Sequence, residues 1–372
     1  MPSNPLDYIN NHRRRLAERA YRMRRIRIAA IGAVICLVAQ LAIVYGLPIE
    51  RRKPEKGEDE SLVTVSHPPS PSIATSILPR DRADAPDKVN EEFDGKPVKV
   101  LGGGAKIVAK DEGSGEEVEL MPTGTSGVPH FPKTIFVPSP DGQKEEYQLL
   151  GLGIRTVSFL NIQVYVVGLY VQKDSLAALQ ADLVKHVNPL ASALIPGEKE
   201  SLRAGLLDAE RSYEIWDTML KKKGGELKTV WRIVPVRNTD FQHLRDGWVR
   251  GITAKTQAAS LRQKKEFDDE SFALAMREFK ALFGGKGRAP KGSVVLLKRD
   301  GDGKLNVLFQ EKDGQREVID FGVIGDERIA RLIWLGYLAG KNVSSEGARK
   351  GIVDGIMELV ERPIGSIETK VS

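Results

Sequence analysis

Cysteine is almost absent from this sequence of 372 residues, which holds only Cys36. No intrachain disulfide can form, and no Cys/His spacing typical of a structural metal site is present. Cys36 falls in an apolar run, where it is expected to behave as a small hydrophobe, so cysteine usage does not indicate a compartment. A G-x-S-x-G motif is also missing, and the sequence therefore gives no sign of a serine nucleophile.

Most of the chain has no excess of charge, although the whole carries a net charge of +6. Residues 1–27 alone hold eight arginines against Asp7 and Glu18, a local net charge of +6. The remainder holds 48 basic and 48 acidic residues. A balanced domain has no electrostatic reason to bind phosphate backbones, so we expect no nucleic-acid partner.

The N-terminal arm, residues 1–27, has the arginine-rich composition of a mitochondrial transit segment, with a cytoplasmic basic flank as the alternative. Residues 28–47 follow without a charged side chain, and Gln40 is their only strongly polar residue. This run spans about 30 Å as a helix, the thickness of the hydrocarbon core, and predicts one transmembrane helix. The positive-inside rule then places the C-terminal part in the intermembrane space of an inner mitochondrial membrane.

Residues 48–95 are rich in Pro, Ser, Asp and Lys and predict a disordered linker. Residues 96–372 predict an α+β domain, because runs of strands alternate with runs of helices and no regular βαβ repeat is present. Residues 96–127 predict weak strands or an irregular entry segment. Strands are then expected at 134–137, 229–236, 293–297, 305–310 and 316–321, and helices at 175–186, 201–222, within 241–283, and at 326–340 and 345–361. The expected sheet is covered by helices on one side.

The stretch from Tyr147 to Val171 predicts two adjoining strands with one arginine, Arg155, in apolar surroundings. Glycines interrupt both strands, which indicates a bulge or a close approach of another backbone. A guanidinium stays charged, so its strand must offer it a partner, solvent or a ligand anion. A solvated face or a structural carboxylate is the plainer interpretation, and a ligand anion is the functional one.

The pattern G-x-G-x-R-x-V at residues 151–157, followed by GLYV at 168–171, resembles the opening hairpin of the chalcone isomerase family. Residues 332–359 are similar to the last helices of that family and the tight turn between them. The resemblance covers roughly residues 131–362. It implies an open-faced sandwich, in which a large antiparallel sheet packs against a helical layer with a ligand cleft between them.

In that family an arginine, which Arg155 matches, stabilises an oxyanion while a phenol adds to an enone. The tyrosine and asparagine of the family fall here at Leu244 and Gly251, its lysine at Pro235 and a threonine at Gly336. The donors that orient substrate and water are therefore missing. We expect no authentic chalcone isomerase activity; the alternative is an active intramolecular lyase with Arg155 as its catalytic residue.

A membrane segment joined to such a domain resembles the fungal "altered inheritance of mitochondria" proteins, a branch associated with haem binding. The resemblance implies a hydrophobic anionic ligand in the cleft, haem first and a fatty acid as the other candidate. The expected ligand-binding residues are Arg155, Tyr165, which lies near the position of a family threonine, and Tyr337. A structural or assembly protein, with the cleft closed by Trp334 and Tyr337, remains a further alternative.

No metal ligand is assigned from the sequence. Three histidines lie in the expected domain, His130, His186 and His243. Each one alone is more often a surface residue or a core residue with satisfied hydrogen bonds than a ligand. The axial ligand of a bound haem, and any other metal site, is therefore left open.

Overall fold

The structure is a computed structural model that describes residues 92–361, except for 94–95, 102–105, 111–116, 140–141, 159, 223, 262–264 and 312–317. The predicted arm and transmembrane helix, and nearly all of the predicted linker, lie outside these residues. In the ranges described, no helix combines the length and the apolar character that a membrane crossing requires. All of the described residues belong to one compact unit, residues 84–372.

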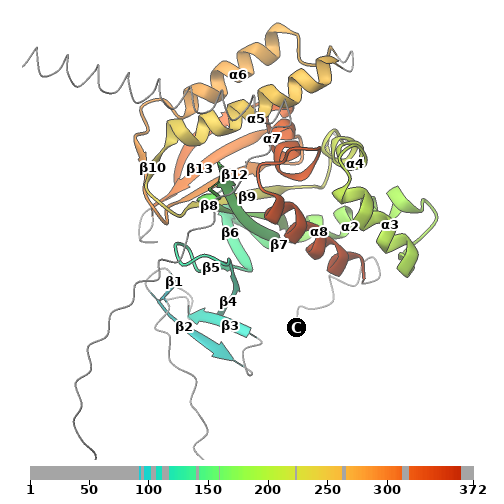
Figure 1. Cartoon of the computed structure of the whole chain (residues 1–372), viewed down its shortest axis with the longest axis horizontal. Helices are drawn as coiled ribbons and strands as arrows, with labels where there is room; N and C mark the ends of the chain where they lie inside the picture. The colour runs from blue at the N-terminus through green and yellow to red at the C-terminus, as the bar shows by residue number, and fades with distance from the viewer. Residues whose placement is uncertain are drawn as a thin grey trace, which may run out of the picture. The chain divides into compact units, whose positions relative to one another are not determined.

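Seven strands form one antiparallel sheet in the order β14-β13-β12-β9-β8-β7-β6 (Figure 1). Their bounds are β6 Thr134–Pro138, β7 Lys144–Val157, β8 Ile162–Gln172, β9 Thr229–Pro235, β12 Val294–Arg299, β13 Leu305–Gln310 and β14 Ile319–Ile324. Strands β7 and β8 are the predicted hairpin, and β14 begins later than predicted. The large antiparallel sheet is thus confirmed.

A smaller five-stranded sheet precedes it in the chain, with the order β1-β2-β3-β4-β5. Its strands are β1 Glu92–Phe93, β2 Lys96–Leu101, β3 Lys106–Lys110, β4 Glu117–Pro122 and β5 His130–Pro132. A third sheet pairs β10, Thr239–Asp240, with β11, Arg288–Ala289. The weak strands expected at 96–127 are therefore present as part of the smaller sheet.

The helices gather on one side of the seven-stranded sheet (Figure 1). They are α2 Leu176–Val187, α3 Pro196–Leu207, α4 Arg211–Leu220, α5 Phe241–Leu261, α6 Glu270–Leu282, α7 Glu327–Leu338 and α8 Glu346–Val360, with a short 3-10 turn at Lys173–Ser175. Asp269, Asp326 and Ser345 cap α6, α7 and α8, because their side chains accept backbone N–H bonds in the first turn. The predicted helical layer is confirmed.

The single helix predicted at 201–222 is wrong, since α3 and α4 are separate helices. The chain leaves α3 at Asp208, which has an extended backbone with φ −68° and ψ 145°. Its Oδ1 accepts the N–H bonds of Glu210 and Arg211, each at 2.9 Å. An aspartate that bonds the backbone just after it competes with continuation of a helix, and hydrophobic periodicity does not reveal this.

Two hydrophobic clusters form on the two faces of the large sheet. Along β8, Tyr165, Val167 and Leu169 belong to the cluster under the helices, whereas Val166 and Tyr170 belong to the opposite one. This alternation is the two-residue period of a strand buried on both faces. Full burial of each large apolar side chain stabilises the fold by roughly 1.5–3 kcal/mol.

Helix α8 lies against β7 with almost no side chain between the two backbones. A Cβ on Gly151 would lie 2.4 Å from α8 backbone atoms, and one on Gly153 would lie 2.2 Å from the nitrogen of Ala348. Ser345, at the start of α8, also donates through Oγ to the carbonyl of Ile154 at 2.8 Å. The glycines of this strand therefore mark a close backbone approach, one of the two features that the sequence indicated, and they hold the start of α8 beside Arg155.

Candidate functional site

Arg155 and Tyr165 lie directly opposite each other on β7 and β8. Opposite residues of an antiparallel pair point to the same face, and Tyr165 packs in the cluster under the helices. The guanidinium carbon of Arg155 lies 5.7 Å from the centroid of the Tyr165 ring, within cation–π range. The register shifts between Arg155 and Thr156, an irregularity of the kind that re-aims a side chain.

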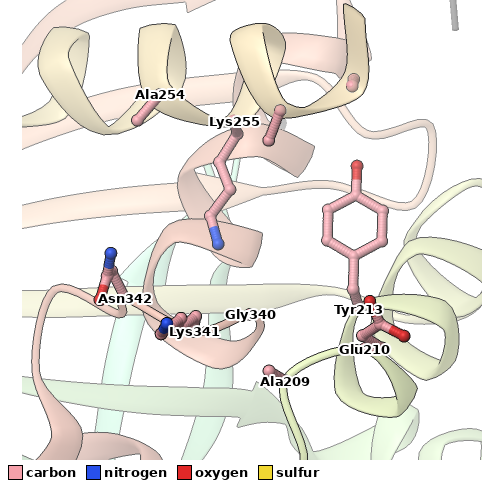
Figure 2. A pocket seen from close by; sticks show the side chains of 10 residues that line it. Ala209, Glu210, Tyr213, Ala254, Lys255, Gly340, Lys341 and Asn342 are labelled. Carbon is pink, nitrogen blue, oxygen red and sulfur yellow. The ribbon is translucent and has the colours of Figure 1, made fainter. Parts of the chain in front are cut away.

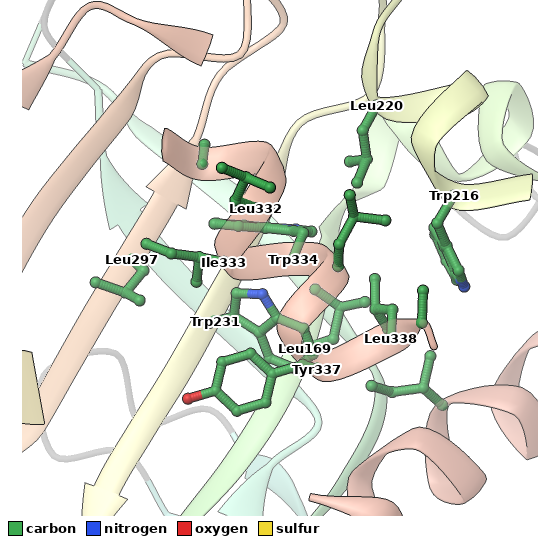
Figure 3. Packing of buried hydrophobic residues seen from close by; sticks show 14 of the residues in the cluster. Leu169, Trp216, Leu220, Trp231, Leu297, Leu332, Ile333, Trp334, Tyr337 and Leu338 are labelled. Atoms are coloured by element: carbon green, nitrogen blue, oxygen red, sulfur yellow. The ribbon is translucent and has the colours of Figure 1, made fainter. Parts of the chain in front are cut away.

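Tyr337 of α7 and Trp248 of α5 complete the group. The hydroxyl oxygens of Tyr165 and Tyr337 are 2.6 Å apart, and Trp248 Nε1 donates to the Tyr337 oxygen at 3.0 Å. The Tyr337 ring also lies over Trp231, with the ring centroids 4.6 Å apart (Figure 3). The structure thus brings together the three residues that the sequence proposed, Arg155, Tyr165 and Tyr337.

The two tyrosines leave one phenolic hydrogen available. A hydrogen bond between the hydroxyls of Tyr165 and Tyr337 uses one of their two hydrogens, whichever residue donates. The indole of Trp248 can only donate, so it takes up neither hydrogen. Within the ranges that the structure describes, no acceptor is present for the second hydrogen. It is therefore a buried donor without an acceptor in these ranges.

The Arg155 guanidinium is half-buried, and among the residues described here no carboxylate pairs with it. Burial lowers the pKa of Arg155, but the neighbouring phenols of Tyr165 and Tyr337 outweigh burial and raise this pKa above its ordinary value. Burial raises the pKa of Tyr165 against the opposing effect of Arg155, and it raises the pKa of Tyr337 well above the ordinary value. A fixed positive charge beside neutral hydroxyl donors is suited to binding an anion.

The positions that correspond to the polar residues of chalcone isomerases supply no donor here. Leu244 is buried in the core on α5, and Pro235 ends β9 opposite Tyr165. A Cβ on Gly251 or Gly336 would meet nothing within 4 Å, so no neighbouring group needs glycine there for space. These positions cannot orient a phenolic substrate through side-chain hydrogen bonds.

The described histidines do not join the Arg155 group. His186 and His243 are exposed on α2 and α5. His130 is buried on β5, whose next residue, Phe131, packs on the opposite face of the large sheet. No described histidine therefore lies in the group around Arg155, whose guanidinium and neighbouring hydroxyls suit a carboxylate.

Trp248 is the member of this group that the sequence reasoning missed. It lies on the buried face of α5 together with Phe241, Leu244 and Ile252. The helical spacing of these residues signals a core face, and this signal was available from the sequence. Periodicity does not reveal that an indole N–H on this face meets a hydroxyl from α7.

In the described part of the chain, no group of three or more His, Cys, Asp or Glu side chains could hold a metal ion.

The antiparallel sheet, its one-sided helical layer and the arginine hairpin define a chalcone isomerase-like domain. The sequence model of the family described as "Chalcone isomerase like" matches residues 145–353. The chain belongs to this family, as the resemblance of its hairpin predicted.

Several relatives are fungal proteins whose names call them mitochondrial. The chain is 31% identical over 235 residues to "Altered inheritance of mitochondria protein 18, mitochondrial" of Debaryomyces hansenii. The alignment covers 63% of this chain and 74% of that protein. It is 30% identical over 248 residues to the protein of the same name from Eremothecium gossypii, covering 66% and 76%. A crystal structure of an Arabidopsis thaliana fatty-acid binding protein is similar with a TM-score of 0.43 and 20% identity, over 61% of this chain and 100% of that one.

Proposed function

We propose that this protein binds a hydrophobic carboxylate, with the carboxylate on Arg155 and the apolar part among the side chains between sheet and helices. The observation that supports the proposal is a half-buried guanidinium that has no acidic partner in the described ranges and lies beside a spare phenolic hydrogen. A guanidinium and a hydroxyl together can bond both oxygens of one carboxylate. A fatty acid is the simplest ligand of this chemistry.

Replacing Arg155 by glutamine is expected to weaken binding of dodecanoate roughly tenfold to a hundredfold, because a hydrogen-bonded charge pair is lost. Tyr165→Phe, which removes the hydroxyl and keeps the ring, is expected to have a smaller effect in the same direction. Titration calorimetry on the purified chain measures both. Arg250→Gln is the matched control, since Arg250 is exposed on α5.

An unchanged affinity in Arg155→Gln would contradict the proposal, and a chain that binds no carboxylate would favour the structural alternative with a closed cleft.

Haem stays a prediction of the sequence resemblance, since a propionate could meet the same guanidinium. A Soret band in the purified protein that disappears in Arg155→Gln would support haem over a fatty acid. Turnover of a chalcone above its spontaneous rate, lost in Arg155→Gln, would instead support the isomerase alternative.

We also propose that the protein is anchored in the inner mitochondrial membrane by residues 28–47, with its folded domain in the intermembrane space. The names of the relatives support the compartment, and the charge-free run in the sequence supports the anchor. The protein is expected to resist carbonate extraction and to become accessible to protease once the outer membrane is ruptured. Deletion of residues 28–47 is expected to release it; protection from protease after rupture would contradict the topology.

A further inference from the structure

A cavity of about 370 Å³ lies between α4, α5 and the loop that follows α7 (Figure 2). Alanines at 254, 258 and 259 of α5 form much of its wall, and Tyr213 of α4 closes one side. The volume lies within the range of small-molecule sites. None of its lining residues belongs to the Arg155 group, so the cavity is a separate place in the fold.

Lys255 extends from α5 into this cavity toward Gly340 (Figure 2). Its Nζ donates a hydrogen bond to the backbone carbonyl of Ala339. Gly340, at φ +91°, leaves room for the ammonium, because a Cβ there would lie 2.7 Å from Nζ. The loop is therefore shaped around the end of the lysine side chain.

The Lys255 ammonium lacks a counterion within the part of the chain described. Arg349 of α8 donates to the carbonyl of Gly340 at 3.1 Å, so two cations bond neighbouring carbonyls of one loop. Arg349 is paired with Glu346 at 2.8 Å, whereas no carboxylate pairs with Lys255. Lys255 is half-buried, so its charge is partly desolvated without a counterion, and a bound anion would offset that cost.

The electrostatic surroundings of Lys255 favour the same conclusion. Burial lowers the pKa of Lys255 to about 8, and repulsion by Arg349 contributes. The other titratable groups that line the cavity are Glu210 and Tyr213 on the α4 side and Lys341 on the loop. At neutral pH the amine is still mostly charged, and an anion at Nζ would raise its pKa again.

We propose that this cavity is a second carboxylate site, in which Lys255 binds the carboxylate of a small molecule whose apolar body lies against the alanine wall. The inference does not rest on the proposed function of Arg155. An alanine wall beside the half-buried ammonium of Lys255, with Lys341 exposed on the loop, suits a monocarboxylate better than inorganic phosphate, which would leave several oxygens without donors.

The test titrates octanoate into the purified full chain by calorimetry, in four variants that combine Arg155 or Arg155→Gln with Lys255 or Lys255→Met. Octanoate is expected to bind the Arg155→Gln chain, and Lys255→Met is expected to weaken this binding at least tenfold. Methionine keeps most of the apolar stem and removes a half-buried charge, so the fold should be retained. Lys350→Met is the matched control, since Lys350 is exposed on α8 and does not line the cavity.

A second measurement needs no substitution at Lys255. Above pH 8 the amine loses its proton, so the binding constant of octanoate in the Arg155→Gln chain is expected to fall about tenfold per pH unit. Near pH 8, binding should also take up protons, which calorimetry detects by comparing buffers of different ionisation enthalpy.

Octanoate binding that is unaffected by Lys255→Met, or that does not weaken as the pH rises through the pKa of Lys255, would overturn the proposal. Equal binding of 1-octanol would reduce the cavity to an apolar pocket, and binding of inorganic phosphate without octanoate would overturn the ligand class. If the affinity for dodecanoate is unchanged by Arg155→Gln, octanoate binding can still be compared between Lys255 and Lys255→Met in the chain that retains Arg155. The two proposals therefore fail separately.

Discussion

Replacing Gly355 by alanine is expected to lower the free energy of unfolding by roughly 3 kcal/mol, although alanine is the better helix former. Gly355 lies on the side of α8 that faces β7, where a Cβ would lie 1.7 Å from the carbonyl oxygen of Leu150. The obstacle is backbone, so the helix or the strand must move as a whole. Overpacking of this kind costs more than the gain in helix propensity, which is about 1 kcal/mol. Urea unfolding measures the difference.

Gly347 offers the matched control on the same helix. A Cβ at Gly347 would meet its nearest neighbour at 3.9 Å, an ordinary contact, so Gly347→Ala is expected to change stability by less than about 1 kcal/mol. If Gly355→Ala were as stable as Gly347→Ala, the close approach of α8 to β7 would be wrong. Because Ser345 ties the start of α8 to the carbonyl of Ile154, a displaced helix should also weaken carboxylate binding at Arg155.

The interface between α8 and β7 could be predicted from the sequence only on one side. Glycine is unfavourable inside a strand, so the glycines of β7 by themselves indicate that another backbone comes close. Gly347, Gly351 and Gly355 recur every four residues and share one face of α8. Their spacing is visible in the sequence, but nothing local says that the partner is β7, about two hundred residues earlier in the chain.

The candidate site was foreseen in part for a similar reason. Arg155 stands out because a charge in an apolar strand needs an explanation, and the hairpin pairing then places Tyr165 opposite it. Trp248 and Lys255 give no such signal. Both lie on α5, seven residues apart and so on one face, but an indole or a lysine on a helix is ordinary. Their chemistry arises from the groups of α7 and the following loop that meet them.

The second large effect is expected at Arg331, which is fully buried on α7. Its guanidinium bonds Asp217 at 2.7 Å, Glu327 at 3.0 Å and also Glu266, and it lies over the ring of Phe267. Arg331→Met is expected to lower the free energy of unfolding by roughly 3 kcal/mol, because the buried Asp217 and the half-buried Glu266 and Glu327 would lose the cation they share, and Lys221 would pair with only two of them. Thermal and urea unfolding measure this loss.

Arg203→Met is the control, since Arg203 pairs with Asp354 at 2.5 Å but both side chains are exposed. That exposed pair is expected to contribute less than about 1 kcal/mol, so equal losses in the two variants would contradict the prediction.

Burial raises the pKa of Asp217, but hydrogen bonds from Lys221 and Arg331 outweigh it and hold this pKa below the ordinary 3.8. An acid whose pKa is lowered by folding stabilises the folded chain at pH values above its pKa in the unfolded chain. This stabilisation is lost as the pH falls through the pKa that the acid has in the folded chain. The difference in the free energy of unfolding between the original chain and Arg331→Met should therefore be largest at pH 7 and should become smaller below about pH 3.8.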